Sequence, residues 1–273
     1  MRLTDRRFGE DGARLSYGSY LRLPELLDQQ RPQSARAAAD GDPGVPAAHD
    51  ELLFITIHQV YELWFKELLH ELGDARDRML AGDPHLPRLR LQRAHVIERV
   101  LLEQVDVLET MTPQDFLQFR ELLAPASGFQ SVQFRELEFL SGAKDAAYLA
   151  RLVHADEAER ERLRRRLDEP TLWDGYVALL GAAGFDTGTE ESRREALVAV
   201  GRDPAGYGGL WDLAEALVEH DARCARWRSR HVLMVERQIG VKSGTGGSSG
   251  APYLRSRLGL RFYPELWELR SYL

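Results

Sequence analysis

Between Asp50 and about Leu80, apolar side chains recur every three or four residues, which is the spacing of one helix face. Two adjacent stripes result, formed by Leu53, Ile57, Val60, Trp64 and Leu68 and by Phe54, His58, Tyr61 and Phe65. A helix that is apolar over so wide an arc is expected in the interior, with His58 inside. No strand alternation longer than four residues and no fixed repeat is visible elsewhere. The sequence therefore predicts an all-α fold, organised as one domain over residues 1–273.

Further helices are expected from about Pro87 to Glu109, over residues 131–141 and from about Gly208 to Gln238. A short aromatic helix is expected to begin at Pro264. Residues 30–48 are rich in proline, alanine, glycine and aspartate, and they predict a loop within an N-terminal arm of residues 1–48. The charged residues 145–200 predict solvated helix faces.

Thr112 and Pro113 have the residue types of a helix N-cap and of the first helical position. The helix that follows is expected to carry Phe116 and Arg120 and to end at Pro125. Arg120 lies beside apolar residues, and a guanidinium in such a place can bind a carboxylate through two parallel hydrogen bonds.

The composition is that of an ordinary globular protein, with 44% hydrophobic and 29% charged residues. A net charge of −7 argues against non-specific binding of nucleic acid. The single cysteine, Cys224, excludes a disulfide within the chain. No signal-peptide pattern and no apolar run of membrane-spanning length is visible, so a cytoplasmic protein without membrane contact is expected.

Five glycines lie within the twelve residues 239–250, directly after a predicted helix. So dense a cluster usually marks backbone that must approach a ligand closely or move. Thr245, Ser248 and Ser249 supply hydroxyls and Lys242 supplies a charge, which suits a small polar or zwitterionic ligand. A flexible surface linker is the alternative. Neither the P-loop pattern nor the dinucleotide-binding pattern fits the segment.

His220 and His231 are eleven residues apart, or about three helical turns, and share a face with Cys224 and Trp227. A histidine among tryptophan and methionine suits axial ligation of haem, whose ring packs against apolar side chains. A core histidine with satisfied hydrogen bonds is the alternative. His58, between aromatic residues, can bind the N–H of an indole ring or the hydroxyl of a phenol.

Several long segments of the chain resemble the tryptophan 2,3-dioxygenase family. They are LSYGSYLRL at 15–23, HDELLFITIHQVYELWFK at 49–66, LETMTP at 108–113, FR at 119–120, PASGFQS at 125–131, WRSRH at 227–231 and GTGGSSG at 244–250. The segments occur in order from residue 15 to residue 250, whereas residues 145–205 match only loosely. The resemblance implies a helical bundle that encloses one b-type haem per chain and assembles into a homotetramer, a dimer of dimers.

The resemblance also implies roles for individual residues. His231 falls on the proximal ligand of the haem iron, and Ser127 and Gly128 fall on a segment that lines the haem. His58 falls on the distal histidine that faces the indole nitrogen, which makes it the catalytic candidate. Arg120 falls on the arginine that binds the substrate carboxylate. The other substrate-binding positions are Phe54, Ile55, Thr56, Ile57, Phe116, Thr245, Tyr17 and Tyr20.

The implied activity is the insertion of both atoms of O2 across the indole C2–C3 bond of L-tryptophan. The product, N-formyl-L-kynurenine, belongs to tryptophan catabolism by the kynurenine pathway. Related haem proteins hydroxylate tryptophan or tyrosine derivatives, so a haem-dependent monooxygenase in a natural-product pathway is the alternative enzyme. A non-catalytic sensor of haem or an amino acid is the alternative from another class. Phe116 stands where some members of the family have tyrosine. Tyr17 and Tyr20 fall on tyrosines that reach a neighbouring subunit's pocket.

Overall fold

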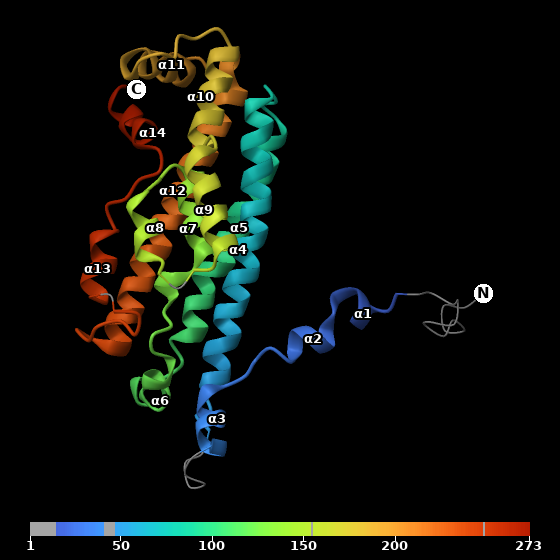
Figure 1. The fold of residues 1–273 in the computed structure, drawn as a ribbon. Helices are drawn as coiled ribbons and strands as arrows, with labels where there is room; N and C mark the ends of the chain where they lie inside the picture. The colour runs from blue at the N-terminus through green and yellow to red at the C-terminus, as the bar shows by residue number, and fades with distance from the viewer. Residues whose placement is uncertain (1–14, 41–46, 154, 248) are drawn as a thin grey trace.

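The computed structural model describes residues 15–40, 47–153, 155–247 and 249–273; residues 1–14 and 41–46 of the arm and Ser248 of the glycine-rich segment lie outside them. Every regular element in these ranges is helical, which confirms the all-α prediction (Figure 1). The α-helices are α1 (Tyr17–Leu21), α2 (Leu23–Leu27), α3 (Gln33–Asp40), α4 (Glu51–Leu80), α5 (Leu86–Leu108), α6 (Pro113–Leu117), α7 (Val132–Ser141), α8 (Ala147–Arg151), α9 (Glu157–Asp168), α10 (Leu172–Ala182), α11 (Glu190–Arg202), α12 (Pro204–Ile239), α13 (Ala251–Ser256) and α14 (Pro264–Glu268). The 3-10 helices are η2 (Arg120–Leu123), η3 (Gly128–Gln130) and η4 (Leu269–Ser271).

Three long helices, α4, α5 and α12, run side by side and form the body of the molecule (Figure 1). Helices α7 and α10 pack against α4. The shared core contains aliphatic side chains that are completely buried, among them Leu72, Leu91 and Leu213. Burial of one such side chain stabilises the fold by about 1.5–3 kcal/mol, so the long helices are held mainly by these contacts.

Helix α4 matches the predicted helix over residues 50–80. Its buried apolar residues follow the expected spacing and are Ile57, Tyr61, Phe65, Leu68, Leu72, Ala75 and Met79. Phe54 and His58 lie one helical turn apart near its N-terminal end and are half-buried. The helix thus supplies both core contacts and side chains that border a cavity.

The predicted loop at residues 30–48 was wrong over α3, which is helical from Gln33 to Asp40. Its sequence is alanine-rich, and alanine has the highest helix propensity. The carboxylate of Glu51, at the start of α4, accepts the backbone N–H groups of Gln33 (2.7 Å) and Ser34 (2.9 Å). This anion satisfies two otherwise unpaired donors and complements the helix dipole. Because the capping residue Glu51 lies 17 and 18 residues after Ser34 and Gln33, the sequence around α3 does not reveal it.

The helix that begins after Thr112 is shorter than predicted. Thr112 is the N-cap, as expected, but α6 ends at Leu117 and Arg120 begins a separate 3-10 turn. Between them, Phe119 leaves helical geometry with φ −130° and is completely buried. Its ring packs edge-on against Phe54 and Phe116, with centroids 5.6 and 5.4 Å away. Burial of this ring accounts for the break in the helix.

Helices α5, α7 and α14 agree with the predictions to within a few residues. The charged region 145–200 forms α8 to α11, and α9 buries only Leu163, as expected for a solvated helix. The expectation was wrong over α10, which packs against α4 and buries Leu172, Tyr176, Leu179 and Leu180. Helix α12 begins four residues before the predicted start, because the side chain of Asp203 caps it through the N–H of Gly206 (2.9 Å). The backbone of α12 kinks at Tyr207.

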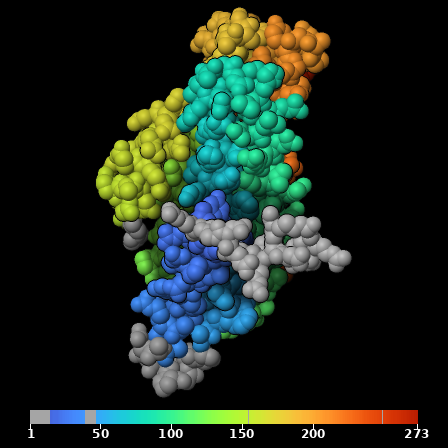
Figure 2. Space-filling model, turned by 90° about the vertical axis from the view of Figure 1, so that its right-hand side faces the viewer, coloured from blue at the N-terminus to red at the C-terminus, as the bar shows by residue number. Residues whose placement is uncertain are grey.

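Helices α1 and α2 extend away from the body of the molecule (Figure 1), and Figure 2 views them from the side to which they project. Many of their apolar side chains are exposed to solvent, with Tyr17 77% and Tyr20 71% exposed. Only the end of this segment contacts α4, where Gln59 donates a hydrogen bond to the carbonyl of Gln29 (3.2 Å). None of the described helices combines the length and the hydropathy needed to cross a lipid bilayer.

Candidate functional site

A cavity of about 520 Å³ lies in the half of the bundle that contains the C-terminal end of α12. Its walls come from α4, α5, the α6–η2 segment, the 126–130 segment, α7, α12 and the 244–254 region. Most of the lining is apolar and aromatic, with a small number of polar side chains between. This composition is typical of ligand sites, where few polar groups fix the orientation of a ligand.

Eight of the predicted site residues line this one cavity, although they come from five separate segments: Phe54, His58, Phe116, Arg120, Ser127, Gly128, His231 and Thr245. The structure does not bring Ile55, Thr56 and Ile57 to the cavity. Successive residues on a helix point about 100° apart, so only positions 54 and 58 share the facing side. Ile57 packs in the core instead, and its carbonyl accepts a hydrogen bond from Gln104 (3.1 Å). Tyr17 and Tyr20 do not line their own chain's cavity either.

His58 is oriented by its own helix. Its Nδ1–H donates to the carbonyl of Phe54 (2.7 Å), and the two rings are in contact, with centroids 4.1 Å apart. Because Nδ1 carries the proton, Nε2 keeps a free lone pair. Burial lowers the pKa of His58 below its usual range, although the Phe54 carbonyl and the charge of Glu62 oppose this shift. At neutral pH the ring is therefore neutral and its Nε2 can accept a hydrogen bond.

His231 borders the cavity from α12. Its ring stacks on Trp227, one turn earlier, with centroids 5.0 Å apart and planes only 5° from parallel. Burial lowers the pKa of His231 to about 4, and His58 contributes to the same shift. The neutral imidazole is the form that binds metals. The structure thus separates the two candidate histidines of α12: His231 faces the cavity, whereas His220 does not.

Arg120 is the polar end of an aromatic wall. The rings of Phe54 and Phe116 stack with centroids 5.6 Å apart, and Arg120 follows one turn after Phe116. The guanidinium donates to the carbonyl of Ser243 and forms no ion pair with any carboxylate in the described part of the chain. Its remaining donors can bind an anionic group in the cavity.

The glycine-rich segment closes one side of the cavity. Thr245 donates its hydroxyl hydrogen to the carbonyl of Ala126 (2.6 Å), which holds the segment against the 125–128 region. At Gly246 a Cβ atom would lie 2.6 Å from the Cβ of Ser127, so only glycine permits this approach. Gly250 has φ +67°, a conformation that favours glycine. Lys242 and Ser249 do not line the cavity.

A buried cluster of charged side chains lines another part of the cavity, and the sequence did not predict it. Glu138 forms an ion pair with Arg135, one turn earlier on α7, and lies 3.8 Å from both Arg228 and Arg257. Three arginines thus surround one carboxylate, and all four residues line the cavity. The net positive charge suits an acidic group on a ligand. The only sequence signal was an arginine and a glutamate at i, i+3 in α7. Arg230, two residues after Arg228 on α12, instead binds Asp106 and Glu109 (both 2.7 Å).

Comparisons with known proteins agree with this geometry. A family model described as tryptophan 2,3-dioxygenase matches residues 4–180 and 189–273. A tryptophan 2,3-dioxygenase of Nocardioides sp. is 59% identical over 274 residues, covering 97% of each chain. Proteins of the same name from Herpetosiphon aurantiacus and Caulobacter vibrioides are 43% and 41% identical. The first match covers 94% of this chain and 98% of the relative, and the second covers 95% and 98%.

Proposed function

Because the chain belongs to the tryptophan 2,3-dioxygenase family, we propose that it inserts both atoms of O2 across the indole C2–C3 bond of L-tryptophan. The product is N-formyl-L-kynurenine, and the protein is an oxidoreductase of tryptophan catabolism. One observation carries the proposal: side chains suited to an indole, a carboxylate and an iron ligand converge on one cavity from five segments. The alternative, monooxygenation of a modified tryptophan or tyrosine, has no observation in its favour.

The cavity fits the haem on which this family depends, and we propose one haem b per chain. His231 offers a neutral imidazole for the iron, backed by the stacked ring of Trp227. The apolar walls suit the macrocycle, with Ser127 and Gly128 along its edge. The arginine cluster around Glu138 supplies positive charge for the propionates. When bound, the haem supplies the activation of O2.

The protein's own side chains hold the substrate in one orientation. Arg120 binds the carboxylate, and Thr245 lies at the amino-acid end. Phe54 and Phe116 pack against the indole, and Nε2 of His58 accepts the indole N–H. Gly244, Thr245 and Gly250 line this end and would shield the bound substrate from water. Fixing the reacting atoms in this way can lower a barrier by up to about 7–11 kcal/mol.

We also propose that the enzyme is a cytoplasmic homotetramer, a dimer of dimers, in which Tyr17 and Tyr20 reach a neighbouring subunit's cavity. The support is the exposure of α1 and α2, most of whose apolar side chains are 40–77% exposed to solvent in their own chain. The exposed apolar residues of this segment are Leu15, Tyr17, Tyr20, Leu21, Leu26 and Leu27. A solvated tail would not carry so many.

Turnover by the purified haem protein tests this function. With ascorbate, O2 and L-tryptophan, the enzyme should form N-formyl-L-kynurenine. The variant His231→Ala should lose both the Soret band of bound haem and turnover, whereas His70→Ala, at an exposed histidine on α4, should keep both. A non-catalytic sensor would bind L-tryptophan without forming product.

A further inference from the structure

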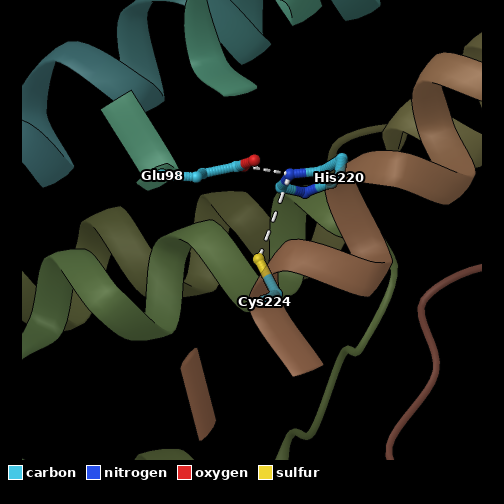
Figure 3. A group of neighbouring side chains, drawn as sticks. All are labelled: Glu98, His220 and Cys224. Atoms are coloured by element: carbon cyan, nitrogen blue, oxygen red, sulfur yellow. Dashed lines mark hydrogen bonds and ion pairs between the residues drawn. The ribbon is translucent and has the colours of Figure 1, made fainter. Parts of the chain in front are cut away.

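A second group of ligand-type side chains lies inside the bundle, outside the lining of the cavity. Glu98 on α5 and His220 on α12 meet with Oε1 and Nδ1 2.5 Å apart, and the Sγ of Cys224, one turn further along α12, lies 4.0 Å from the same nitrogen (Figure 3). One donor atom from each residue lies within 4.8 Å of the others. A thiol, an imidazole and a carboxylate thus converge on one point.

The ring of His220 is held so that Nδ1 faces this point. Ser141 on α7 lies 2.9 Å from Nε2 on the opposite side, where its hydroxyl oxygen accepts the Nε2–H. Phe262 stacks on the ring, with centroids 5.5 Å apart and planes 21° from parallel. Metal-binding histidines typically donate their second N–H to such an oxygen, which fixes the tautomer and the direction of the free lone pair.

One carboxylate oxygen of Glu98 lacks a hydrogen-bond partner among the described residues. The carboxylate is buried, with its side chain only 6% exposed, and Oε1 faces His220. The other oxygen, Oε2, is buried and has no hydrogen-bond partner among the residues that the structure describes. A buried acceptor without a partner costs roughly 1–3 kcal/mol, so such a group calls for an explanation.

We propose that Glu98, His220 and Cys224 bind one Zn²⁺ ion per chain. Sulfur, nitrogen and oxygen donors of this kind suit zinc, with bonds of about 2.0–2.3 Å and hence ligand atoms roughly 3.3–3.8 Å apart. The cluster reaches this geometry by shifts of less than about 1 Å, as Glu98 draws back from His220 and Cys224 moves inward. Oε1 then binds the ion, a water molecule takes the fourth position of the tetrahedron, and this water donates a hydrogen bond to Oε2. The ion replaces the proton shared by His220 and Glu98 and the thiol proton of Cys224, and both protons leave to solvent.

This site is separate from the cavity and has another role. Cys224 precedes His231 by seven residues, about 10 Å along α12. The ion would tie α5 to α12, the helix that carries His231, and so stabilise the folded state by its binding free energy. Cys224 is half-buried, whereas Glu98 and His220 are buried.

The test uses the purified, haem-containing full chain, stripped of loose metal with a chelator and titrated with Zn²⁺ or Co²⁺. Zinc is counted apart from iron by elemental analysis. One equivalent should be retained, and Co²⁺ should give a thiolate-to-metal charge-transfer band together with tetrahedral d–d bands. Zinc should also raise the Tm of the apo-site protein.

The variant Cys224→Ala keeps the Glu98–His220 pair and should fold, but it should lose the charge-transfer band and at least about 100-fold in zinc affinity. Glu98→Gln should weaken binding similarly. Glu103→Gln, at a 70% exposed carboxylate on the same helix, should bind as the unmodified chain does. Equal zinc binding by the chain and by Cys224→Ala, or Co²⁺ binding without a thiolate band, would overturn the proposal. Neither readout depends on dioxygenase activity.

Discussion

Two neutral histidines on opposing helices define the chemistry of the cavity. Burial lowers the pKa of both, that of His231 to about 4, so at neutral pH both rings offer a lone pair. Their uses differ because their surroundings differ. His231 is stacked on Trp227 and faces the cavity, whereas Nδ1 of His58 is fixed by the Phe54 carbonyl, which leaves Nε2 as the free acceptor.

The protonation state of His58 predicts how kcat/KM falls at low pH. Protonation would remove the acceptor at Nε2, so kcat/KM should fall about tenfold per pH unit below the pKa of His58. Because burial holds the folded-state pKa below 6.5, the midpoint of this acid limb should lie below pH 6.5. The measurement is the pH dependence of kcat/KM for L-tryptophan. An acid limb centred above pH 6.5, or an identical limb in His58→Gln, would show that another group titrates.

Arg120 predicts which end of the substrate matters for binding. The variant Arg120→Leu should raise KM for L-tryptophan about 10- to 150-fold, because a hydrogen bond to a charged group is worth roughly 1.5–3 kcal/mol. Tryptamine lacks the carboxylate and should be bound equally by both forms, and the Soret band should not change. Arg237→Leu, at a 72% exposed arginine, is the matched control. If KM for L-tryptophan stays the same, Arg120 does not bind the carboxylate.

Individual site residues could be predicted where a residue type and its local pattern were both distinctive. His58, Arg120 and His231 were identified in this way, with the family resemblance supplying their roles. The cluster of Arg135, Glu138 and their neighbours could not, because Arg228 and Arg257 reach Glu138 from distant parts of the chain. Charges on a helix are usually solvated, so their burial depends on packing that the sequence does not display.

Among the elements, helical periodicity predicted the long helices α4, α5 and α12, since each buries apolar residues at helical spacing. The errors arose where a distant residue decides the local structure. Glu51 caps α3 from another helix, and burial of Phe119 interrupts the helix after α6. Such long-range effects override local composition.

The close contact of Gly246 predicts an effect of one added methyl group. In Gly246→Ala the new Cβ would lie 2.6 Å from the Cβ of Ser127, so the segment must move away from the cavity. Overpacking of this kind costs about 1–3 kcal/mol, or roughly 5- to 150-fold in kcat/KM if it opposes closure. Gly208→Ala, where an added Cβ meets no atom within 4 Å, should have no such effect.

Ser127→Gly should restore activity to Gly246→Ala, because it removes the opposing Cβ atom. The measurement is a double-mutant cycle on kcat/KM with the Soret band recorded for each form. Purely additive effects of the two substitutions would mean that this contact does not hold the segment in its working position.

At the scale of the whole molecule, the projecting arm is incompletely packed within one chain (Figure 1). Deletion of residues 1–24 should therefore weaken assembly and lower kcat, while haem binding through His231 should persist. Light scattering and the Soret band separate these effects. A truncated protein that is tetrameric and fully active would show that Tyr17 and Tyr20 do not serve a neighbouring subunit.

The proposed reaction places both atoms of one O2 molecule on one indole ring. The most direct measurement is a single turnover with ¹⁸O₂ and L-tryptophan, followed by mass analysis of the product. We predict N-formyl-L-kynurenine with two labelled oxygen atoms in each molecule. A product that carries a single labelled atom, with the second recovered in water, would identify a monooxygenase and contradict the proposed function.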